Sequence, residues 1–233
     1  MSDWITFFDS DHAIYVNARH KQVHAVITGD GMLDHIDQGD RVLDYGCGEA
    51  AYAERLLRKA GRLTLCEAAP TLRQRVRERV AREPRISMLS PEDVAALPDE
   101  SFDLIIMHSV SQYLSPVELD ALLAQFSRLL QPDGKLVIGD VVQPDTPASK
   151  DAMALLRFGS REGFFIAAFR GLVRTVFSDY SKLRKSAGLT RYGEHIMATK
   201  LNTAGFRAER ATRNIGHFQT RITFVARRRL PAS

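Results

Sequence analysis

The fold is most readily recognised from the stretch Val42-Leu43-Asp44-Tyr45-Gly46-Cys47-Gly48-Glu49. Its apolar first half predicts a buried strand, and a helical pattern begins at Ala50, directly after the Gly-X-Gly turn. Glycines at such a turn let the backbone approach a ligand where a Cβ would collide. The turn would lie at the carboxyl end of a strand, where open α/β sheets bind their ligands. Taken alone, it is compatible with a dinucleotide site or with an ordinary tight turn.

Strands and helices alternate on both sides of this turn. Apolar runs predict strands over 41–45, 63–66, 85–89, 102–107 and 135–140, and helical patterns lie between them over 50–60, 71–82 and 116–130. The sequence Gln-Pro-Asp-Gly at 131–134 predicts a turn before the fifth strand. Such alternation indicates βαβ units, and therefore a parallel sheet with right-handed crossovers.

The pattern changes in the last third of the chain. Residues 146–204 show no convincing strand and predict two or three helices, whereas 206–213 and 221–227 predict an antiparallel strand pair. The stretch 164–177 is amphipathic, with apolar residues repeating every fourth position beside two arginines: Phe165, Phe169, Val173 and Phe177 with Arg170 and Arg174. Three interpretations remain open for it: a lid that lines an acceptor pocket, a homodimer interface, or a basic surface for anionic lipid.

Charge is unevenly distributed along the chain. Residues 1–149 carry 15 basic and 23 acidic side chains, whereas residues 150–233 carry 17 basic and 5 acidic ones, for a formal net charge of +4. A basic region raises the possibility of nucleic acid as a partner. The arginines alternate with apolar residues instead of forming a tract with stacking aromatics, which makes nucleic acid an unlikely partner.

Composition excludes several other classes. With 45% hydrophobic and 26% charged residues the chain is globular, and two cysteines cannot build a disulfide framework. No Cys/His cluster has zinc spacing, so we expect no metal. The acidic start Met1-Ser2-Asp3-Trp4 does not resemble a secretory signal, and no run of about 18 apolar residues predicts a membrane span. We therefore expect a cytoplasmic protein.

Three features near the glycine turn narrow the choice of ligand. The third glycine of the dinucleotide fingerprint is missing, because Gly48 is followed by Glu-Ala-Ala. Asp44 precedes the turn, where it would repel a pyrophosphate but can pair with an ammonium group. Glu67 ends the second strand, where a carboxylate can bind both ribose hydroxyls. S-adenosylmethionine satisfies these features better than NAD does.

The chain resembles the class I S-adenosylmethionine-dependent methyltransferases, in their small-molecule branch. The segment 42–48 is similar to the first motif of that family. Further similar segments are 92–98 (Glu-Asp-Val-Ala-Ala-Leu-Pro), 102–106 (Phe-Asp-Leu-Ile-Ile), 130–136 (Leu-Gln-Pro-Asp-Gly-Lys-Leu) and 204–206 (Ala-Gly-Phe). Two positions depart from the pattern, since Ala50 replaces a glycine and Glu92 replaces the glycine before the acid.

The resemblance implies a fold and its division along the chain. The fold would be an α/β, Rossmann-like, seven-stranded, mostly parallel sheet with an antiparallel last strand, helices on both faces and a helical lid inserted before strand six. The single domain would comprise a helical cap (1–39), a cofactor-binding half (40–142), a lid and acceptor region (143–204) and a terminal strand pair (205–229).

The resemblance also implies roles for individual residues. Asp44, Gly46 and Gly48 would surround the methionine moiety of the cofactor, together with Cys47, whose thiol we expect to be buried without chemistry of its own. Glu67 would bind the ribose and Ala68 the adenine, while Asp93 and the Val94 backbone would bind the edge of the adenine ring. His108 and Ser109 would lie beside the transferring methyl. In the N-terminal segment, Tyr15 and Arg19 share a helical face, and Arg19 would pair with the methionine carboxylate.

The predicted activity is methyl transfer from S-adenosylmethionine, with S-adenosylhomocysteine as product, to a small-molecule or lipid-like acceptor by in-line displacement. A general base is required only where the acceptor must lose a proton. His108 is the first candidate for that base, and Tyr113, His195 and His217 are others. Asp140 ends the fifth strand and is either an acceptor contact or a solvated carboxylate. The alternatives are an RNA methyltransferase and a non-catalytic cofactor-binding protein; the chain would be a monomer or homodimer with possible contact to anionic membranes.

Overall fold

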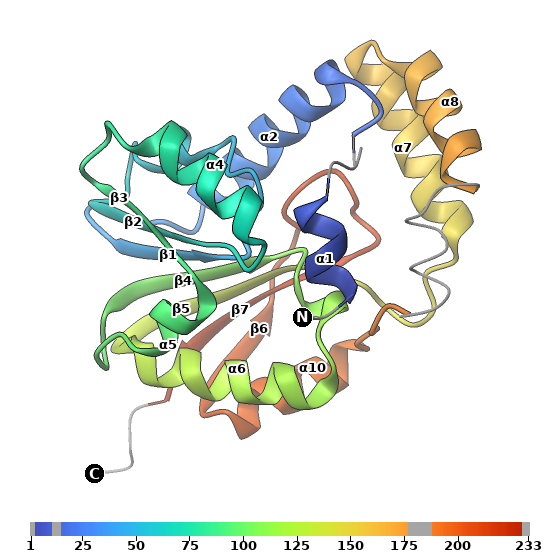
Figure 1. The fold of residues 1–233 in the computed structure, drawn as a ribbon. Coiled ribbons are helices and arrows are strands. Elements are labelled where there is room, and N and C mark those ends of the chain that lie inside the picture. Colours follow the sequence, from blue (N-terminus) through green and yellow to red (C-terminus); the bar gives the residue numbers. More distant parts are fainter. Residues whose placement is uncertain (1–2, 11–14, 177–187, 230–233) are drawn as a thin grey trace.

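A seven-stranded sheet forms the centre of the molecule (Figure 1). The computed structural model describes residues 3–10, 15–176 and 188–229. The strands, in the spatial order β3-β2-β1-β4-β5-β7-β6, are β1 Arg41–Tyr45, β2 Arg62–Cys66, β3 Ile86–Leu89, β4 Phe102–His108, β5 Leu130–Val141, β6 Phe206–Arg210 and β7 Ile222–Arg228. The pairs from β3 to β5 are parallel, and β7 is antiparallel to both β5 and β6. This arrangement confirms the predicted Rossmann-like sheet with its antiparallel last strand.

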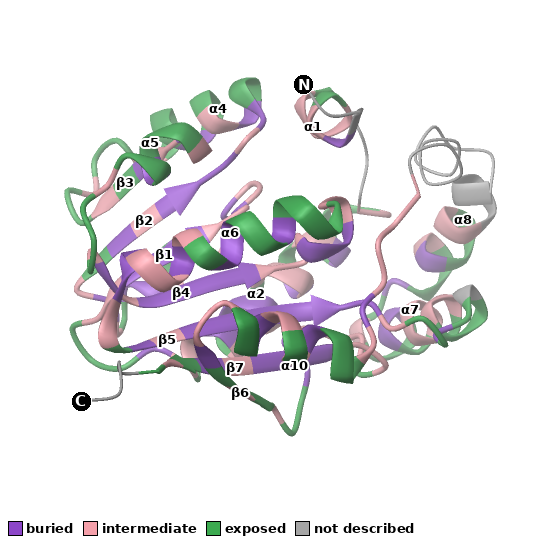
Figure 2. Cartoon of the chain, turned by 90° about the horizontal axis from the view of Figure 1, so that it is seen from below, coloured by how far each residue is buried: buried purple, intermediate pink, exposed green. Residues whose placement is uncertain are grey.

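Helices cover both faces of the sheet. They are α1 Asp3–Asp9, α2 Ala18–Leu33, α3 Ala53–Leu56, α4 Pro70–Val80, α5 Pro91–Ala95, the 3-10 helix η1 Ser111–Tyr113, α6 Pro116–Leu129, α7 Ala148–Glu162, α8 Phe165–Val176 and α10 Glu194–Thr203. Apolar residues of α2, α3 and α4 form one core, and those of α5, α6 and α10 form the other. Figure 2 shows the central strands buried between two helical layers whose outer faces are exposed.

Local sequence explains where these elements begin. In α6, the Ser115 side chain accepts from the Glu118 backbone while Glu118 accepts from the Ser115 N–H, and Pro116 occupies the first turn. The helix then buries Leu119, Leu123 and Phe126 completely against the sheet. This capping box and apolar stripe are why the predicted boundaries at 116–130 agree closely with the structure.

Two predicted elements differ from the structure. The helix expected over 50–60 is reduced to α3, because Ala50 has a positive φ of 43° and residues before Ala53 form turns. The turn expected at 131–134 lies within β5, where it forms an irregularity: Phe102 pairs with Leu130, but Leu104 pairs with Lys135. The extra residues bulge out of the ladder and do not end the strand.

The helices α7 and α8 lie beyond the carboxyl ends of the parallel strands (Figure 1). The sharp turn between them uses Gly163 in a left-handed conformation (φ 79°). Phe164, which directly precedes α8, and Ala168 within α8 pack against Phe158 of α7 and Val23 of α2.

The face of α8 that packs on α7 and α2 is not the stripe that carries Phe165 and Phe169. Phe165 and Phe169 are 48% and 56% exposed, because the buried face is instead the one that carries Phe164 and Ala168. Arg170 is also exposed. The side chains of Val173 and Arg174, and all of Phe177, lie outside the described residues.

Candidate functional site

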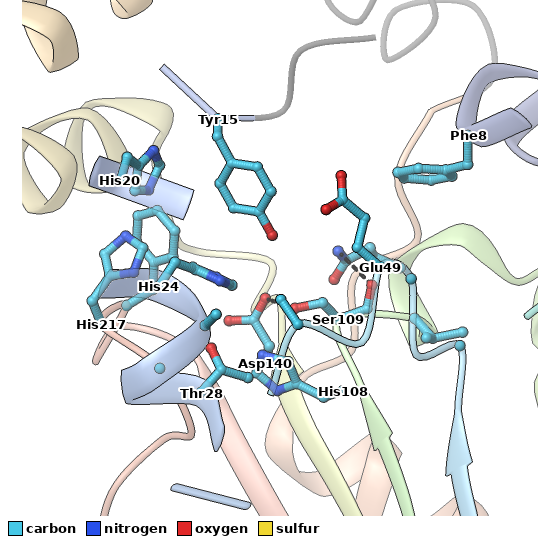
Figure 3. Close-up of a pocket in the computed structure, with 18 of the residues that line it drawn as sticks. Phe8, Tyr15, His20, His24, Thr28, Glu49, His108, Ser109, Asp140 and His217 are labelled. Carbon is cyan, nitrogen blue, oxygen red and sulfur yellow. Dashed lines mark hydrogen bonds between the residues drawn. The ribbon is translucent and has the colours of Figure 1, made fainter. Parts of the chain in front are cut away.

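A large cavity opens at the carboxyl ends of β1, β2, β4 and β5 (Figure 3). Its volume is about 2520 Å³, and its walls also include residues of α1, α2, α7 and α8. Pockets for single small ligands usually measure about 300–1,000 Å³. The cavity therefore has room for two ligands side by side.

The Gly-X-Gly turn forms one wall of this cavity. A Cβ on Gly46 (φ 79°) would lie 2.3 Å from Cγ2 of Val110, whereas a Cβ on Gly48 (φ 55°) would meet nothing within 4 Å. Gly46 is therefore required by the packing of the turn, and Gly48 keeps a space free. The N–H groups of Gly46 and Cys47 both donate to the Cys66 carbonyl, at 2.8 and 3.0 Å. The N–H groups of Gly46 and Cys47 are therefore not free to bind a ligand. The turn instead lets a ligand approach its backbone closely at Gly48.

Glu67 lies beside this turn and is 8% exposed. Its Oε2 accepts from the Gly48 N–H at 2.9 Å, and its Oε1 accepts from the Ala69 N–H at 2.9 Å. Burial raises the pKa of Glu67, and these backbone hydrogen bonds oppose the rise. Each carboxylate oxygen can accept a second hydrogen bond, so two vicinal hydroxyls can be held on the cavity side. Ala68 lines the same wall.

Asp44 lies behind the turn and is 1% exposed. Tyr52, which sequence reasoning missed, donates its hydroxyl to Asp44 Oδ2 at 3.0 Å. Asp44 Oδ1 is buried with no partner in the described part of the chain. Burial raises the pKa of Asp44 to about 7 against the opposing Tyr52 hydrogen bond. A buried carboxylate with a free oxygen is suited to a cationic group approaching across the turn.

A second polar group lies at the ends of β4 and β5. Ser109 and Asp140 both have positive φ values, 58° and 64°, and the Ser109 hydroxyl donates to Asp140 Oδ2 at 2.6 Å. Arg221 also donates to Asp140, at 2.5 Å, and to Asp151, at 3.2 Å. Burial would raise the pKa of Asp140, but Arg221 lowers it below its ordinary value. His108 lies next to this group, and its Nδ1 is buried without a partner in the described residues.

Comparison with known proteins finds relatives for part of the chain. Residues 43–138 match the family described as methyltransferase domain. The chain is 28% identical over 149 residues to carboxy-S-adenosyl-L-methionine synthase of Dichelobacter nodosus, covering 60% of this chain and 62% of the relative. It is 32% identical over 98 residues to nodulation protein S of Rhizobium tropici, covering 42% and 41%.

The solved structure of the N-methyltransferase NodS from Bradyrhizobium japonicum WM9, in complex with S-adenosyl-L-homocysteine, has the same fold. The TM-score is 0.57 at 19% identity, with 98% of this chain and 97% of that chain covered. The chain thus matches a methyltransferase domain over residues 43–138 and has the fold of an N-methyltransferase solved with S-adenosyl-L-homocysteine. It spans less than two thirds of the length of the curated relatives named above.

Most of the residues expected to form the methyltransferase site line the cavity. They are Tyr15, Gly46, Cys47, Gly48, Glu67, Ala68, His108 and Ser109, and Tyr113, Asp140 and His217 lie there too. Burial, followed by the charge of Glu49, raises the pKa of Tyr15 to about 12, so its hydroxyl is neutral. Burial raises the pKa of the Cys47 thiol well above its ordinary value, which agrees with an unreactive thiol.

Five expected residues do not line the cavity, and one of them, Asp44, is buried behind the glycine turn. Arg19 is exposed and pairs with Glu162 at 3.8 Å, because α2 turns its face toward the end of α7. Asp93 closes a capping box with Ser90 at the start of α5, and Val94 is buried in the core. Pro91 and Glu92 face the cavity in their place. His195 is exposed on α10, among residues away from the cavity.

The N-terminal helix α1 closes part of the cavity mouth. Trp4 packs against Tyr113 with ring centroids 4.6 Å apart, and the Asp9 carboxylate accepts from the Thr71 N–H at 2.6 Å, at the start of α4. Among the described residues, no helix combines the length and apolar character needed to cross a membrane. The same part of the chain holds no group of three or more His, Cys, Asp or Glu side chains arranged for a metal ion.

Proposed function

We propose that this protein transfers a methyl group from S-adenosylmethionine to a small-molecule or lipid-like acceptor. The observation that carries the proposal is the open left-handed position of Gly48 directly beside the Glu67 carboxylate. A ligand backbone can lie against Gly48 while its ribose hydroxyls bind Glu67. The family match over 43–138 covers this wall of the cavity.

The residues of this cavity wall are suited to binding S-adenosylmethionine. Gly46 and Gly48 would contact the methionine moiety, the free oxygen of Asp44 would compensate its ammonium group, and Ala68 would pack on the adenine. Pro91 and Glu92 take the adenine-edge position that sequence reasoning gave to Asp93 and Val94. When bound, S-adenosylmethionine supplies an electrophilic methyl group on a positively charged sulfur.

The chain's own contribution is mainly to position the acceptor. An in-line displacement requires the acceptor atom about 3 Å from the methyl carbon, on the axis of the carbon–sulfur bond. His108 and Ser109 stand where the Gly turn meets the remaining half of the cavity. That half would hold the acceptor.

Ligand-dependent stability tests the proposal. S-adenosylhomocysteine at 100-fold above its Kd should stabilise the protein by about 2.7 kcal/mol. For a chain of this length that corresponds to roughly 5–11 °C in Tm. NAD should produce no shift. If neither sulfur nucleoside shifts the Tm, the assignment is wrong, and if both bind but no acceptor fraction of a cell extract gains labelled methyl, the protein is a cofactor-binding protein without transfer.

The exposed apolar stripe on α8 favours contact of the cavity rim with a lipid surface. Phe165 and Ile166 are 48% and 67% exposed and also reach the cavity, and Arg170 lies beside them. Such a rim would rest on an anionic lipid surface. Anionic vesicles should then retain the protein, and Arg170→Glu should weaken retention. Equal retention of the variant would argue against this face.

A further inference from the structure

Three imidazole rings gather on the side of the cavity that faces Glu49 across the opening (Figure 3). His20 and His24 come from α2, and His217 comes from the loop between β6 and β7. Their ring centroids are 6.1 Å apart for His20–His24, 5.8 Å for His24–His217 and 6.1 Å for His20–His217. In the described part of the chain these side chains are not arranged to hold a metal ion.

Local sequence places these rings. The Asn17 side chain caps α2 by accepting from the His20 N–H at 2.8 Å. His20, His24 and Thr28 follow at intervals of four, and therefore lie on one face of the helix. The loop carrying His217 is fixed to the end of β5, since Asn214 Oδ1 accepts from the Asp140 N–H at 3.1 Å.

Two of the three histidines act as walls. His20 stacks on Phe164, with centroids 5.0 Å apart and planes inclined by 21°. His217 stacks on Phe158 at 4.2 Å and 12°. Val16 donates its N–H to His20 Nδ1, so the proton of neutral His20 is on Nε2. The Nε2 atoms of His20 and His217 are buried and have no partner among the described residues.

His24 is placed differently. The neighbouring rings of Tyr15, His20 and His217 meet it at angles of 61° to 87°, so none is stacked on it. Figure 3 shows the His24 imidazole and the Tyr15 hydroxyl pointing into the space above Asp140. Burial lowers the pKa of His24 to about 4, with His108 adding to the fall and Asp140 opposing it. His24 is therefore neutral at physiological pH and can accept a proton.

The rest of the cavity lining beside the three histidines is polar, and its main charged groups are paired with one another. Thr28 Oγ1, His108 Nδ1 and Gln112 Oε1 are buried without partners in the described chain. Each such atom costs about 1–3 kcal/mol unless a ligand satisfies it. Arg221 is shared between Asp140 and Asp151. This end consequently suits a flat, uncharged ligand with polar atoms at its edge.

We propose that this end of the cavity binds a planar aromatic hydroxyl compound as the methyl acceptor and that His24 accepts its hydroxyl proton. The inference rests on the proposed methyl transfer and specifies its acceptor. Stacked rings form the walls of the subsite, and the Tyr15 hydroxyl and the Asp140 carboxylate lie at its polar edge.

The reaction balances with the groups present. A lone pair of the acceptor oxygen attacks the methyl carbon, and the carbon–sulfur bond breaks with its electron pair moving to sulfur. As the new oxygen–carbon bond forms, the hydroxyl proton becomes strongly acidic and passes to a ring nitrogen of His24. The products are an aryl methyl ether, S-adenosylhomocysteine and an imidazolium that Asp140 stabilises until it releases its proton to water.

The test compares phenols of different acidity. Tritiated-methyl S-adenosylmethionine is supplied with 2-naphthol, with 4-nitrophenol, with 2-naphthylamine or with dodecanol. The wild-type chain, His24→Gln, His24→Asn and the control Gln22→Ala are compared; Gln22 is exposed on the same helix and outside the cavity. Binding of S-adenosylhomocysteine is measured for every variant.

We expect transfer to the phenols only. Both His24 variants should lose roughly 100-fold or more with 2-naphthol. The loss should be much smaller with 4-nitrophenol in mildly alkaline buffer, because that acceptor is already ionised. Both should bind S-adenosylhomocysteine as the wild type does, and Gln22→Ala should be unchanged.

Two results would overturn the inference while leaving the proposed function intact. One is binding of S-adenosylhomocysteine with no transfer to either phenol, or transfer to the amine or the aliphatic alcohol instead. The other is an equal loss with both phenols, which would make His24 a structural residue. Failure of the wild-type chain to bind S-adenosylhomocysteine would instead refute the proposed function.

Discussion

Replacement of Gly48 by alanine separates the folding role of the glycine turn from its binding role. The new Cβ would point into open space, with no protein atom within 4 Å, so the folded chain accepts it sterically. A left-handed alanine costs about 1–2 kcal/mol. For a domain of this size that lowers the Tm by roughly 2–8 °C. The variant should therefore fold.

Binding should respond far more strongly. The added methyl group occupies the space against which the cofactor would lie, and overpacking of this kind costs about 1–3 kcal/mol. The Kd for S-adenosylhomocysteine should rise roughly 5- to 150-fold. Isothermal titration calorimetry measures this directly at a temperature well below the Tm of both proteins.

Gly39→Ala provides the matched control. Gly39 has a φ of 90°, a Cβ there would also meet nothing within 4 Å, and it precedes β1 at the opposite end of the strand from the cavity. It should lose stability to a similar extent and bind S-adenosylhomocysteine normally. If Gly48→Ala binds within twofold of the wild type, the cofactor does not lie against this turn and the reasoning is refuted.

Three further tests address the charged groups of the site. Glu67→Gln should weaken S-adenosylhomocysteine binding at least about 10-fold with only a small fall in Tm, since one carboxylate oxygen acceptor is lost; unchanged affinity would remove Glu67 from the site. For Asp44, the folded-state pKa of about 7 exceeds the ordinary value of 3.8, so the folded state binds more protons and stability should fall as pH rises from about 4 to 7. Urea unfolding of the wild type and Asp44→Asn should show this fall in the wild type alone; parallel pH curves would contradict it. Arg221→Met should destabilise by about 3–5 kcal/mol by leaving the buried Asp140 carboxylate unpaired, and adding Asp140→Asn should recover much of that loss; an additive double variant would show that the pair is not coupled.

The sheet was predictable because its strands are continuous apolar runs ended by turn residues. Buried parallel strands have this pattern, and the expected bounds of β1 agree with the structure at both ends. The glycine turn and Glu67 were predictable for the same reason, since the ends of adjacent parallel strands must meet at one edge of the sheet. Their positions depend on local sequence and topology alone.

Residues whose placement depends on tertiary packing were not predictable. Asp93 is an exception, because Ser90 three residues earlier is a local signal for the capping box that the structure shows. The amphipathic pattern of α8 identifies an apolar stripe but not which stripe meets α7, and Phe164 and Ala168 are buried instead of Phe165. The four-residue spacing of His20 and His24 was a usable signal. It could not predict the histidine cluster, because His217 comes from a distant loop that only the tertiary fold places beside α2.

The two walls of the cavity have different origins along the chain. The Gly turn, Glu67 and His108 come from one continuous stretch, and the family match over 43–138 spans that stretch. The opposite wall is assembled from α2 before it and from Asp140 onward after it. Substitutions confined to the cavity-lining residues of the outer segments therefore change this opposite wall and leave the inner stretch unchanged. If the inner stretch binds the methyl donor as proposed, acceptor preference can diverge in this way without a change in donor binding.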